Sequence, residues 1–424
     1  MHRRAHTAMA HRSAALLCVL AAPLRASLRT ATHTRLGCKI AAPAGPGGVA
    51  HLITTGDWRE SAGRTVAALL ELDLPVADWL CAFGAVYVDN RRVTDTELLV
   101  SGEAYLRVHT KPRRYPAADS TDWLSVVHHE TADFVVIEKP RGVPVHASLD
   151  NSVETCQARL GHALGVQLLC PHRLDVETRG LLLFAKSPEF LSAFNQLLAA
   201  RRVRKVYRAL CEPSSLASQL APSPGELRHW MLPGKRSPVR LAPHSARQAD
   251  PEKSRSAIRS DSSRGGRGGS DSHALDNRDA WRECVSRVHE AREVSVRFSE
   301  DETDADTTAH RFYPMLEIEL ELVTGYTHQL RAQLAYSGWS ISGEQIYAAN
   351  GPSAEDARAA AAKLAATAAP NAAAGNLPGV GPPKLLVPAA KKLFFGLVAH
   401  ELQFQCPLSA EHFHFKLPAE RRWS

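Results

Sequence analysis

Apolar residues along the chain fall into short strand-like runs, separated by a few stretches with helical spacing. The runs near the end alternate apolar with polar residues, which is typical of strands with one buried face. Helical spacing occurs at residues 188–202 and 327–337. Because strands outnumber helices and strict alternation favours antiparallel pairing, the pattern predicts an α+β fold with a mainly antiparallel mixed sheet, rather than a doubly wound parallel sheet. The predicted strands are 133–139, 180–186, 205–211, 315–323 and 397–405.

A separate small unit is predicted at residues 56–116. The stretch "RTVAALLELDL" has apolar residues at helical spacing, and "GAVYVDNRRV" then alternates around Val86 and Val88, with a hairpin turn predicted at Asp89 and Asn90. This order resembles the alpha-L RNA-binding module, and the resemblance implies that its arginines contact phosphates. The alternative is an ordinary small α+β unit with solvated arginines. The candidate RNA contacts are Arg64, Arg91 and Arg92.

A second domain is predicted at residues 120–424, with two polar or low-complexity interruptions. The first, at about 243–310, includes "SRGGRGGSDS" and the acidic run "EDETDAD". The second, at about 353–390, begins rich in alanine and ends rich in proline and glycine. Both compositions predict disordered insertions. RGG clusters can contact RNA, but one short copy is more typical of a solvated loop.

Residues 1–55 have the composition of an organelle-targeting leader. No Asp or Glu occurs before Asp57, and the stretch is rich in Ala, Arg, Thr and Ser. Its apolar block at 14–24 resembles the apolar core of a secretory signal and is too short to span a membrane comfortably. We therefore predict import into a plastid or a mitochondrion, and a mature protein that does not associate with membranes. The alternative is a merely disordered N-terminus.

The net charge of +7 does not by itself indicate a nucleic-acid partner. The predicted leader holds seven of the 51 basic residues, so the remaining chain has 44 basic residues against 44 acidic ones. An RNA partner must therefore be argued from the location of charge, not from its sum. The eight cysteines form no CxxC pair, and no histidines lie at zinc-ligand spacing beside them, so we predict reduced thiols, no metal and no disulfide framework.

Three separated sequence blocks contain the candidate catalytic residues. They are "DFVVIEKPRGVPVHAS" from residue 133, "HRLDVETRGLLLFAK" from residue 172 with "RKVYRAL" after it, and "VTGYTHQLRAQLAYSGWSISGEQIY" from residue 323. In this order the blocks resemble the RluA-type RNA pseudouridine synthases, and in their continuation "KSPEF" the plant plastid-type members of that family. The resemblance covers residues 120–415 outside the two insertions.

The resemblance implies an enzyme that isomerises uridine to pseudouridine in RNA. This reaction breaks the N1–C1′ bond, rotates the base and rejoins it through C5, so no cofactor is needed. A carboxylate can serve as the nucleophile if it stays ionised, and a neighbouring cation favours the ionised form. By resemblance Asp175 is the nucleophile and Arg331 is the cation, 156 residues further along the chain.

Uridine must leave the RNA helix to reach such a nucleophile. The resemblance implies that Tyr207 stacks on the extruded base, that Leu330 walls the pocket and that Arg173 fills the gap left in the RNA. The expected partner is rRNA or tRNA, bound by a monomer. Further phosphate-binding charge is predicted around the site, at Lys111, Arg113, Arg114, Arg201, Arg202, Arg204, Lys205 and Arg208.

Each residue has an ordinary structural alternative. Asp175 and Arg331 could form a plain salt bridge, and Tyr207 could be a core residue. His172 and His328 are predicted to be structural hydrogen-bonding residues. The joint occurrence of the motifs in order favours the catalytic interpretation.

Two positions depart from the family pattern. Arg179 replaces a small residue, and Tyr326 replaces an arginine. We expect them to affect the choice of substrate more than activity.

Three functions are compatible with these motifs. The first is an organellar pseudouridine synthase acting on rRNA, tRNA or other RNA. The second is a catalytically silent RNA-binding or ribosome-assembly protein, and the third is a glycosidase that releases uracil. Retention of Asp175, Tyr207 and Arg331 together favours the first, since RNA binding alone needs none of them.

Overall fold

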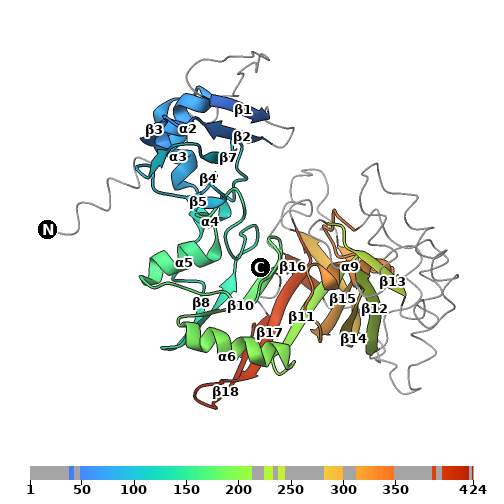
Figure 1. The fold of residues 1–424 in the computed structure, drawn as a ribbon. Helices are drawn as coiled ribbons and strands as arrows, with labels where there is room; N and C mark the ends of the chain where they lie inside the picture. The colour runs from blue at the N-terminus through green and yellow to red at the C-terminus, as the bar shows by residue number, and fades with distance from the viewer. Residues whose placement is uncertain are drawn as a thin grey trace, which may run out of the picture. The chain divides into compact units, whose positions relative to one another are not determined.

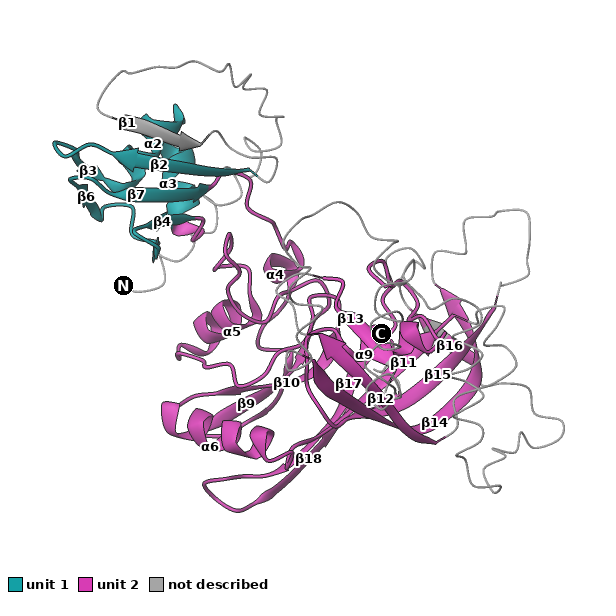
Figure 2. Ribbon diagram, turned by 45° about the vertical axis from the view of Figure 1, so that its right-hand side comes forward, with its two compact units in different colours: residues 1–81, 86–108 teal, residues 82–85, 109–424 magenta. Residues whose placement is uncertain are grey.

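The computed structural model describes two compact units, which are treated separately below (Figures 1 and 2). Unit 1 comprises the described part of residues 1–81 and 86–108, and unit 2 that of residues 82–85 and 109–424. Most of the predicted leader and the whole RGG stretch lie outside the described residues. The described residues are 38–42, 48–212, 224–232, 237–243, 281–298, 312–347, 384–387, 394–419 and 423.

Unit 1 combines a sheet with two short helices. Among its described residues the sheet has the strand order β1-β2-β7-β4-β5, with β3 and β6 as a separate pair. Asp89 and Asn90 both have positive φ, at 47° and 64°, and join β4 to β5, so the predicted hairpin turn is confirmed. The elements are β1 (Cys38–Ala42), β2 (Val49–Thr54), β3 (Arg59–Ser61), α2 (Ala62–Leu70), α3 (Leu74–Ala82), β4 (Val86–Val88), β5 (Arg91–Val93), β6 (Leu99–Ser101) and β7 (Tyr105–His109).

The strands of unit 1 start earlier in the chain than the predicted boundary at residue 56. Both β1 and β2 lie within the range predicted as leader, and they pair with each other as antiparallel strands. Ala50, Leu52 and Thr54 of β2 are buried and alternate with half-buried neighbours. The absence of acidic residues, which defined the predicted leader, carries no information on strand pairing, whereas this period of two does.

Unit 2 is built on one large sheet. Among its described residues the sheet has eleven strands, with a main order of β13-β12-β14-β15-β11-β17-β10-β9-β8; β16 pairs with β14 and β18 with β17. Every neighbouring pair is antiparallel except β10–β17 and β14–β16. The predicted α+β class with a mainly antiparallel sheet is confirmed, as are all five predicted strands and both helices. The corresponding elements are β9 (Phe134–Lys139), β10 (Arg179–Ala185), α6 (Pro188–Ala199), β11 (Arg204–Cys211), β15 (Tyr313–Leu322), α9 (Gln329–Tyr336) and β17 (Leu397–Gln405).

Several elements of unit 2 were not predicted, and two of them contradict the predicted insertions. The strands β14 and β16 lie inside ranges expected to be disordered. Arg287 and Arg292 of β14 form ion pairs with Glu321 and Glu317 of β15, so charges within the predicted insertion are paired across the sheet. The unpredicted elements are α4 (Ala117–Ser120), β8 (Val127–Glu130), α5 (Cys156–Leu164), β12 (Gly225–Leu232), β13 (Arg240–Pro243), β14 (Arg282–Phe298), β16 (Lys384–Val387) and β18 (His412–Lys416).

Strand β10 is buried along its whole length, which explains its continuous apolar sequence. Leu182 and Phe184 pack into one core cluster, whereas Leu181 and Leu183 pack into the other, together with α6. A strand covered on both faces needs no polar alternation. No helix within the described ranges is long and apolar enough to cross a membrane.

Gly180 sets how closely β10 approaches β17. Its φ is +111°, and a Cβ at this position would lie 2.2 Å from the carbonyl oxygen of Ala399. Only glycine tolerates both the dihedral angle and the contact. The close approach fixes the start of β10, immediately after the turn that carries Asp175.

Candidate active site

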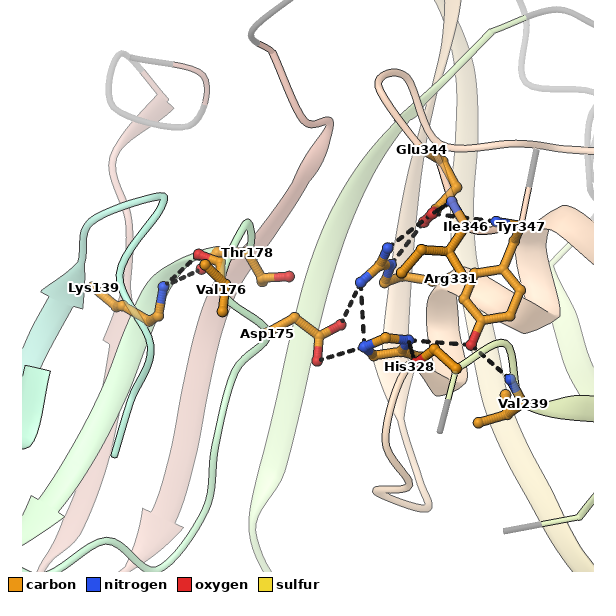
Figure 3. Close-up of polar contacts among 11 residues, drawn as sticks. Lys139, Asp175, Val176, Thr178, Val239, His328, Arg331, Glu344, Ile346 and Tyr347 are labelled. Carbon is orange, nitrogen blue, oxygen red and sulfur yellow. Dashed lines mark hydrogen bonds and ion pairs between the residues drawn. The ribbon is translucent and has the colours of Figure 1, made fainter. Parts of the chain in front are cut away.

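Asp175 lies in a turn just before β10, and the side chain of Lys139 forms hydrogen bonds with the backbone of this turn (Figure 3). Lys139 Nζ donates hydrogen bonds to the carbonyl oxygens of Val176 at 3.0 Å, Thr178 at 2.9 Å and Pro140 at 2.8 Å. Lys139 is fully buried, and this burial lowers its pKa to about 8. The backbone of the turn is therefore fixed by a buried cation that connects it to the end of β9.

The structure brings Asp175 and Arg331 together, as the motifs predicted. Arg331 Nη1, on helix α9, donates to Asp175 Oδ2 at 3.2 Å (Figure 3). The Arg331 side chain is only 7% exposed and that of Asp175 is 16% exposed. A charge pair that is shielded from water to this degree interacts more strongly than a surface pair.

Glu344 is a second carboxylate on the same arginine, and no sequence motif had singled it out. Its Oε2 accepts from Arg331 Nε at 2.7 Å and its Oε1 from Nη2 at 2.8 Å. The backbone N–H of Ile346 also donates to Oε1, at 2.8 Å (Figure 3). Burial opposes ionisation of Glu344, but these hydrogen bonds and the charge of Arg331 outweigh it and lower its pKa. The available signal was an acid 13 residues after Arg331, inside the third motif block.

His328 lies beside the Asp175–Arg331 pair. It has a left-handed backbone, with φ 58°, just before α9. Its Nε2 is 3.7 Å from Asp175 Oδ1, and its Nδ1 is 3.1 Å from the hydroxyl of Tyr347 and 3.1 Å from that of Ser237. Burial lowers the pKa of His328 even though Asp175 opposes this shift, so the neutral imidazole dominates at pH 7. His328 makes the hydrogen bonds predicted for it and also faces the carboxylate.

Tyr207 and Leu330 belong to the core cluster next to this site. Both are almost fully buried, at 6% and 5% exposure, and they share their cluster with Leu174 and Phe395. Burial and then the charge of Asp175 raise the pKa of Tyr207 well above its usual range, so its hydroxyl stays protonated. Arg173, two residues before Asp175, is exposed.

The predicted RNA contacts Arg64, Arg91 and Arg92 all lie in unit 1. Arg64 and Arg91 are exposed. Arg92 donates to the hydroxyl of Tyr87 at 2.7 Å, and Arg107 lies over the same ring, 4.2 Å from its centroid. Arg92, Tyr87 and Arg107 are cross-strand neighbours on β5, β4 and β7, and they form a row of cations around one aromatic ring on a single face of the sheet.

Part of the predicted phosphate-binding charge in unit 2 has another role. Arg204 pairs with Glu401, and Arg208 pairs with Glu317 at 3.1 Å and with Glu319. These arginines extend from β11 to neighbouring strands and neutralise acids within the sheet. Their charges are compensated within the sheet, and RNA contact by Arg204 and Arg208 stays a prediction.

The two departures from the family pattern have defined surroundings. Arg179 is 8% exposed and pairs with Glu138 on the adjacent strand β9. Its charge is thus compensated within the sheet. The backbone N–H of Tyr326 donates to Gln329 Oε1 at 3.2 Å, at the start of α9.

Within the described ranges, no group of three or more His, Cys, Asp or Glu residues could hold a metal ion. Six cysteine side chains are described, all as free thiols: Cys81, Cys156, Cys170, Cys211, Cys284 and Cys406.

Comparison with known proteins places this site in a family. Residues 133–336 match the family described as RNA pseudouridylate synthase. The chain is 30% identical over 264 residues to "RNA pseudouridine synthase 6, chloroplastic" of Arabidopsis thaliana, covering 60% of this chain and 47% of that protein. It is 37% identical over 94 residues to "Pseudouridylate synthase RPUSD4, mitochondrial" of Xenopus tropicalis, covering 20% of this chain and 29% of that protein.

Among solved structures, Human RNA Pseudouridylate Synthase Domain Containing 1 matches 69% of this chain and 82% of its own, with a TM-score of 0.39 and 16% identity. The chain spans about half the length of the plant relative. The sequence matches define an RNA pseudouridylate synthase domain. That domain is of the RluA type, as the motif blocks indicated.

Proposed function

We propose that the protein isomerises uridine to pseudouridine in RNA, with Asp175 as the nucleophile. The observation that carries this proposal is the partly buried pairing of Asp175 with Arg331, next to Tyr207, inside a pseudouridylate synthase domain. Arg331 orients the carboxylate through one hydrogen bond to Oδ2, while Asp175 Oδ1 receives no hydrogen bond from it.

The reaction balances without a co-reactant. Asp175 attacks C1′ of the ribose as the N1–C1′ bond breaks and uracil leaves with the electron pair. After the base rotates, C5 attacks C1′ and the carboxylate is displaced. The proton lost from C5 leaves for solvent, and N1 gains one. Tyr207, with its protonated hydroxyl, and Leu330 would hold the extruded base during its rotation, and the exposed Arg173 would occupy its place in the RNA.

RNA binding through unit 1 is part of this proposal. Arg64 and Arg91 offer exposed cations, and Arg92 and Arg107 add half-buried cations around the buried ring of Tyr87. Phosphates favour surfaces that carry such cations. We place the protein in an organelle, because its relatives include proteins named as chloroplastic and mitochondrial.

The competing function is a catalytically silent RNA-binding protein. A buried charge pair beside a polar turn costs desolvation free energy and gives no advantage in RNA binding. Its presence favours the enzyme.

The test uses RNA labelled with tritium at C5 of uridine. A synthase releases tritium to water and forms pseudouridine without free uracil, whereas a glycosidase releases uracil and a binding protein releases neither. Pseudouridine mapping of organellar RNA with and without the gene would then identify the substrate. Absence of tritium release on total organellar RNA lacking these modifications would contradict the proposal.

A further inference from the structure

Arg331 donates hydrogen bonds to two carboxylates, but in unequal number. Glu344 takes two hydrogen bonds, from Nε and Nη2, whereas Asp175 takes one, from Nη1 to Oδ2 (Figure 3). Glu344 is itself fixed, because its Oε1 also accepts from the backbone N–H of Ile346. The guanidinium is thus anchored along one edge by a buried acid that belongs to its own segment of the chain.

This anchoring determines how many oxygens of Asp175 the guanidinium of Arg331 can contact. A guanidinium and a carboxylate prefer a bidentate pair, in which both oxygens accept. If Arg331 were free to rotate, it could form such a pair with Asp175 and occupy both oxygens. Held by Glu344, it meets Oδ2 only, and the nearest described polar neighbour recorded for Oδ1 is His328 Nε2, at 3.7 Å.

We propose that Glu344 is a positioning residue that prevents Arg331 from binding Asp175 through both oxygens and so leaves Oδ1 available for reaction. This inference rests on the proposed function of Asp175. Glu344 acts only through Arg331 and does not touch the RNA.

The charge of Glu344 supports this role over plain packing. One arginine compensates two carboxylates here, and the Glu344 side chain is fully buried. A second buried acid next to the nucleophile is unfavourable unless its charge is used. A neutral amide could fill the same volume, but it replaces one acceptor oxygen with an NH2 donor. It therefore could not form the parallel pair in which Nε and Nη2 each donate to a separate oxygen.

The first test is Glu344→Gln, assayed by pseudouridine formation per folded molecule. We expect kcat to fall on the order of 100-fold, because a misplaced catalytic group can cost this much. KM should stay near the wild-type value. Glu344→Asp keeps the charge and should recover part of kcat, which also provides a variant if the Gln protein does not fold.

A double-mutant cycle separates positioning from general stability. In an Arg331→Met background, Glu344→Gln should cost no further activity, since the residue has nothing left to position. An equal fold-loss in both backgrounds would overturn the inference.

Glu317→Gln is the matched control. Glu317 is 2% exposed and accepts from Arg208 and Arg292, away from Asp175 and Arg331. It should lower thermal stability while kcat per folded molecule stays unchanged. A matching loss of kcat would mean that removing any buried acid impairs turnover, which overturns a specific role for Glu344.

A crystal structure of Glu344→Gln gives a readout that does not depend on turnover. Two hydrogen bonds from Arg331 to Asp175 would support the inference, and a guanidinium still making one bond from Nη1 would overturn it. If the wild-type protein forms no pseudouridine, the proposed function fails, while the structure still decides how Glu344 acts on Arg331.

Discussion

Lys139 Nζ lies 2.9 Å from the carbonyl oxygen of Thr178, and this buried hydrogen bond connects the end of β9 to the turn that carries Asp175. The same ammonium group donates to Val176. A fully buried cation that holds the turn of Asp175 has two measurable consequences, one for turnover and one for the pH dependence of stability.

Lys139→Met should loosen the turn of Asp175 and reduce turnover. The substitution removes three hydrogen bonds to carbonyl oxygens in a buried place, and each unsatisfied acceptor is costly. We expect a loss of about 1–3 kcal/mol in the free energy of unfolding, measured by urea denaturation. Lys186→Met, which removes a less buried lysine from the end of the same sheet region, is the control and should leave turnover intact.

The lowered pKa of Lys139 also predicts a stability that rises with pH. Between about pH 8, its folded value, and 10.5, its ordinary value, the unfolded chain binds more protons than the folded one. Stability attributable to this residue therefore increases across that window, by up to about 1.4 kcal/mol per pH unit. The comparison is the difference in unfolding free energy between wild type and Lys139→Met at pH 7.5 and 10. A difference that does not change with pH would contradict a buried, charged Lys139.

Arg331→Met should abolish most activity and destabilise the fold. It leaves Glu344 buried without its partner, which typically costs about 3–5 kcal/mol. The pairing with Arg331 lowers the pKa of Glu344, so the stabilisation is present above its ordinary value of 4.5 and is lost as pH falls below it. The destabilisation by Met should therefore shrink on acidification. Arg331→Lys should restore activity only in part, since an ammonium group lacks the planar fork that donates to both oxygens of Glu344 in parallel.

Membership in a sequence motif explains which site residues could be predicted. Asp175, Tyr207 and Arg331 lie in motif blocks whose order is readable, and apolar runs such as 180–186 predict strands by composition. Glu344 lies in the third motif block, but no sequence pattern distinguishes it. Its role depends on the backbone N–H of Ile346 and on the position of α9, and only the fold brings these together.

Strand β14 lies in a range that was wrongly predicted to be a disordered insertion. Its sequence is rich in Arg and Glu, which by composition indicates a solvated segment. In the structure its apolar residues Val294, Val296 and Phe298 are buried, and its charges form ion pairs with β15, such as Arg292 with Glu317. These ion pairs are invisible until the two strands are aligned. Charge composition alone could not distinguish a loop from a strand whose charges are paired across the sheet.

Single substitutions in unit 1 test the RNA contacts. Arg64→Ala and Arg91→Ala should each weaken RNA binding and reduce the slope of log K against log salt by about 1, as expected for one lost phosphate contact. Chemistry at saturating RNA should survive. Arg59→Ala, an exposed arginine on β3 of the same unit, is the control. Unchanged salt slopes for both test variants would remove unit 1 from the RNA-binding surface.

Asp175→Asn tests the proposed chemistry most directly. The substitution is nearly isosteric, so the fold and the RNA affinity should persist while pseudouridine formation falls to background. Some stability should be lost, because Arg331 no longer faces a charge at Nη1, and a melting curve measures this loss. Glu177→Gln is the matched control, since it removes an exposed charge of the same sign two residues along the chain and should leave turnover largely intact. A folded Asp175→Asn protein that binds RNA and still forms pseudouridine would show that another group is the nucleophile.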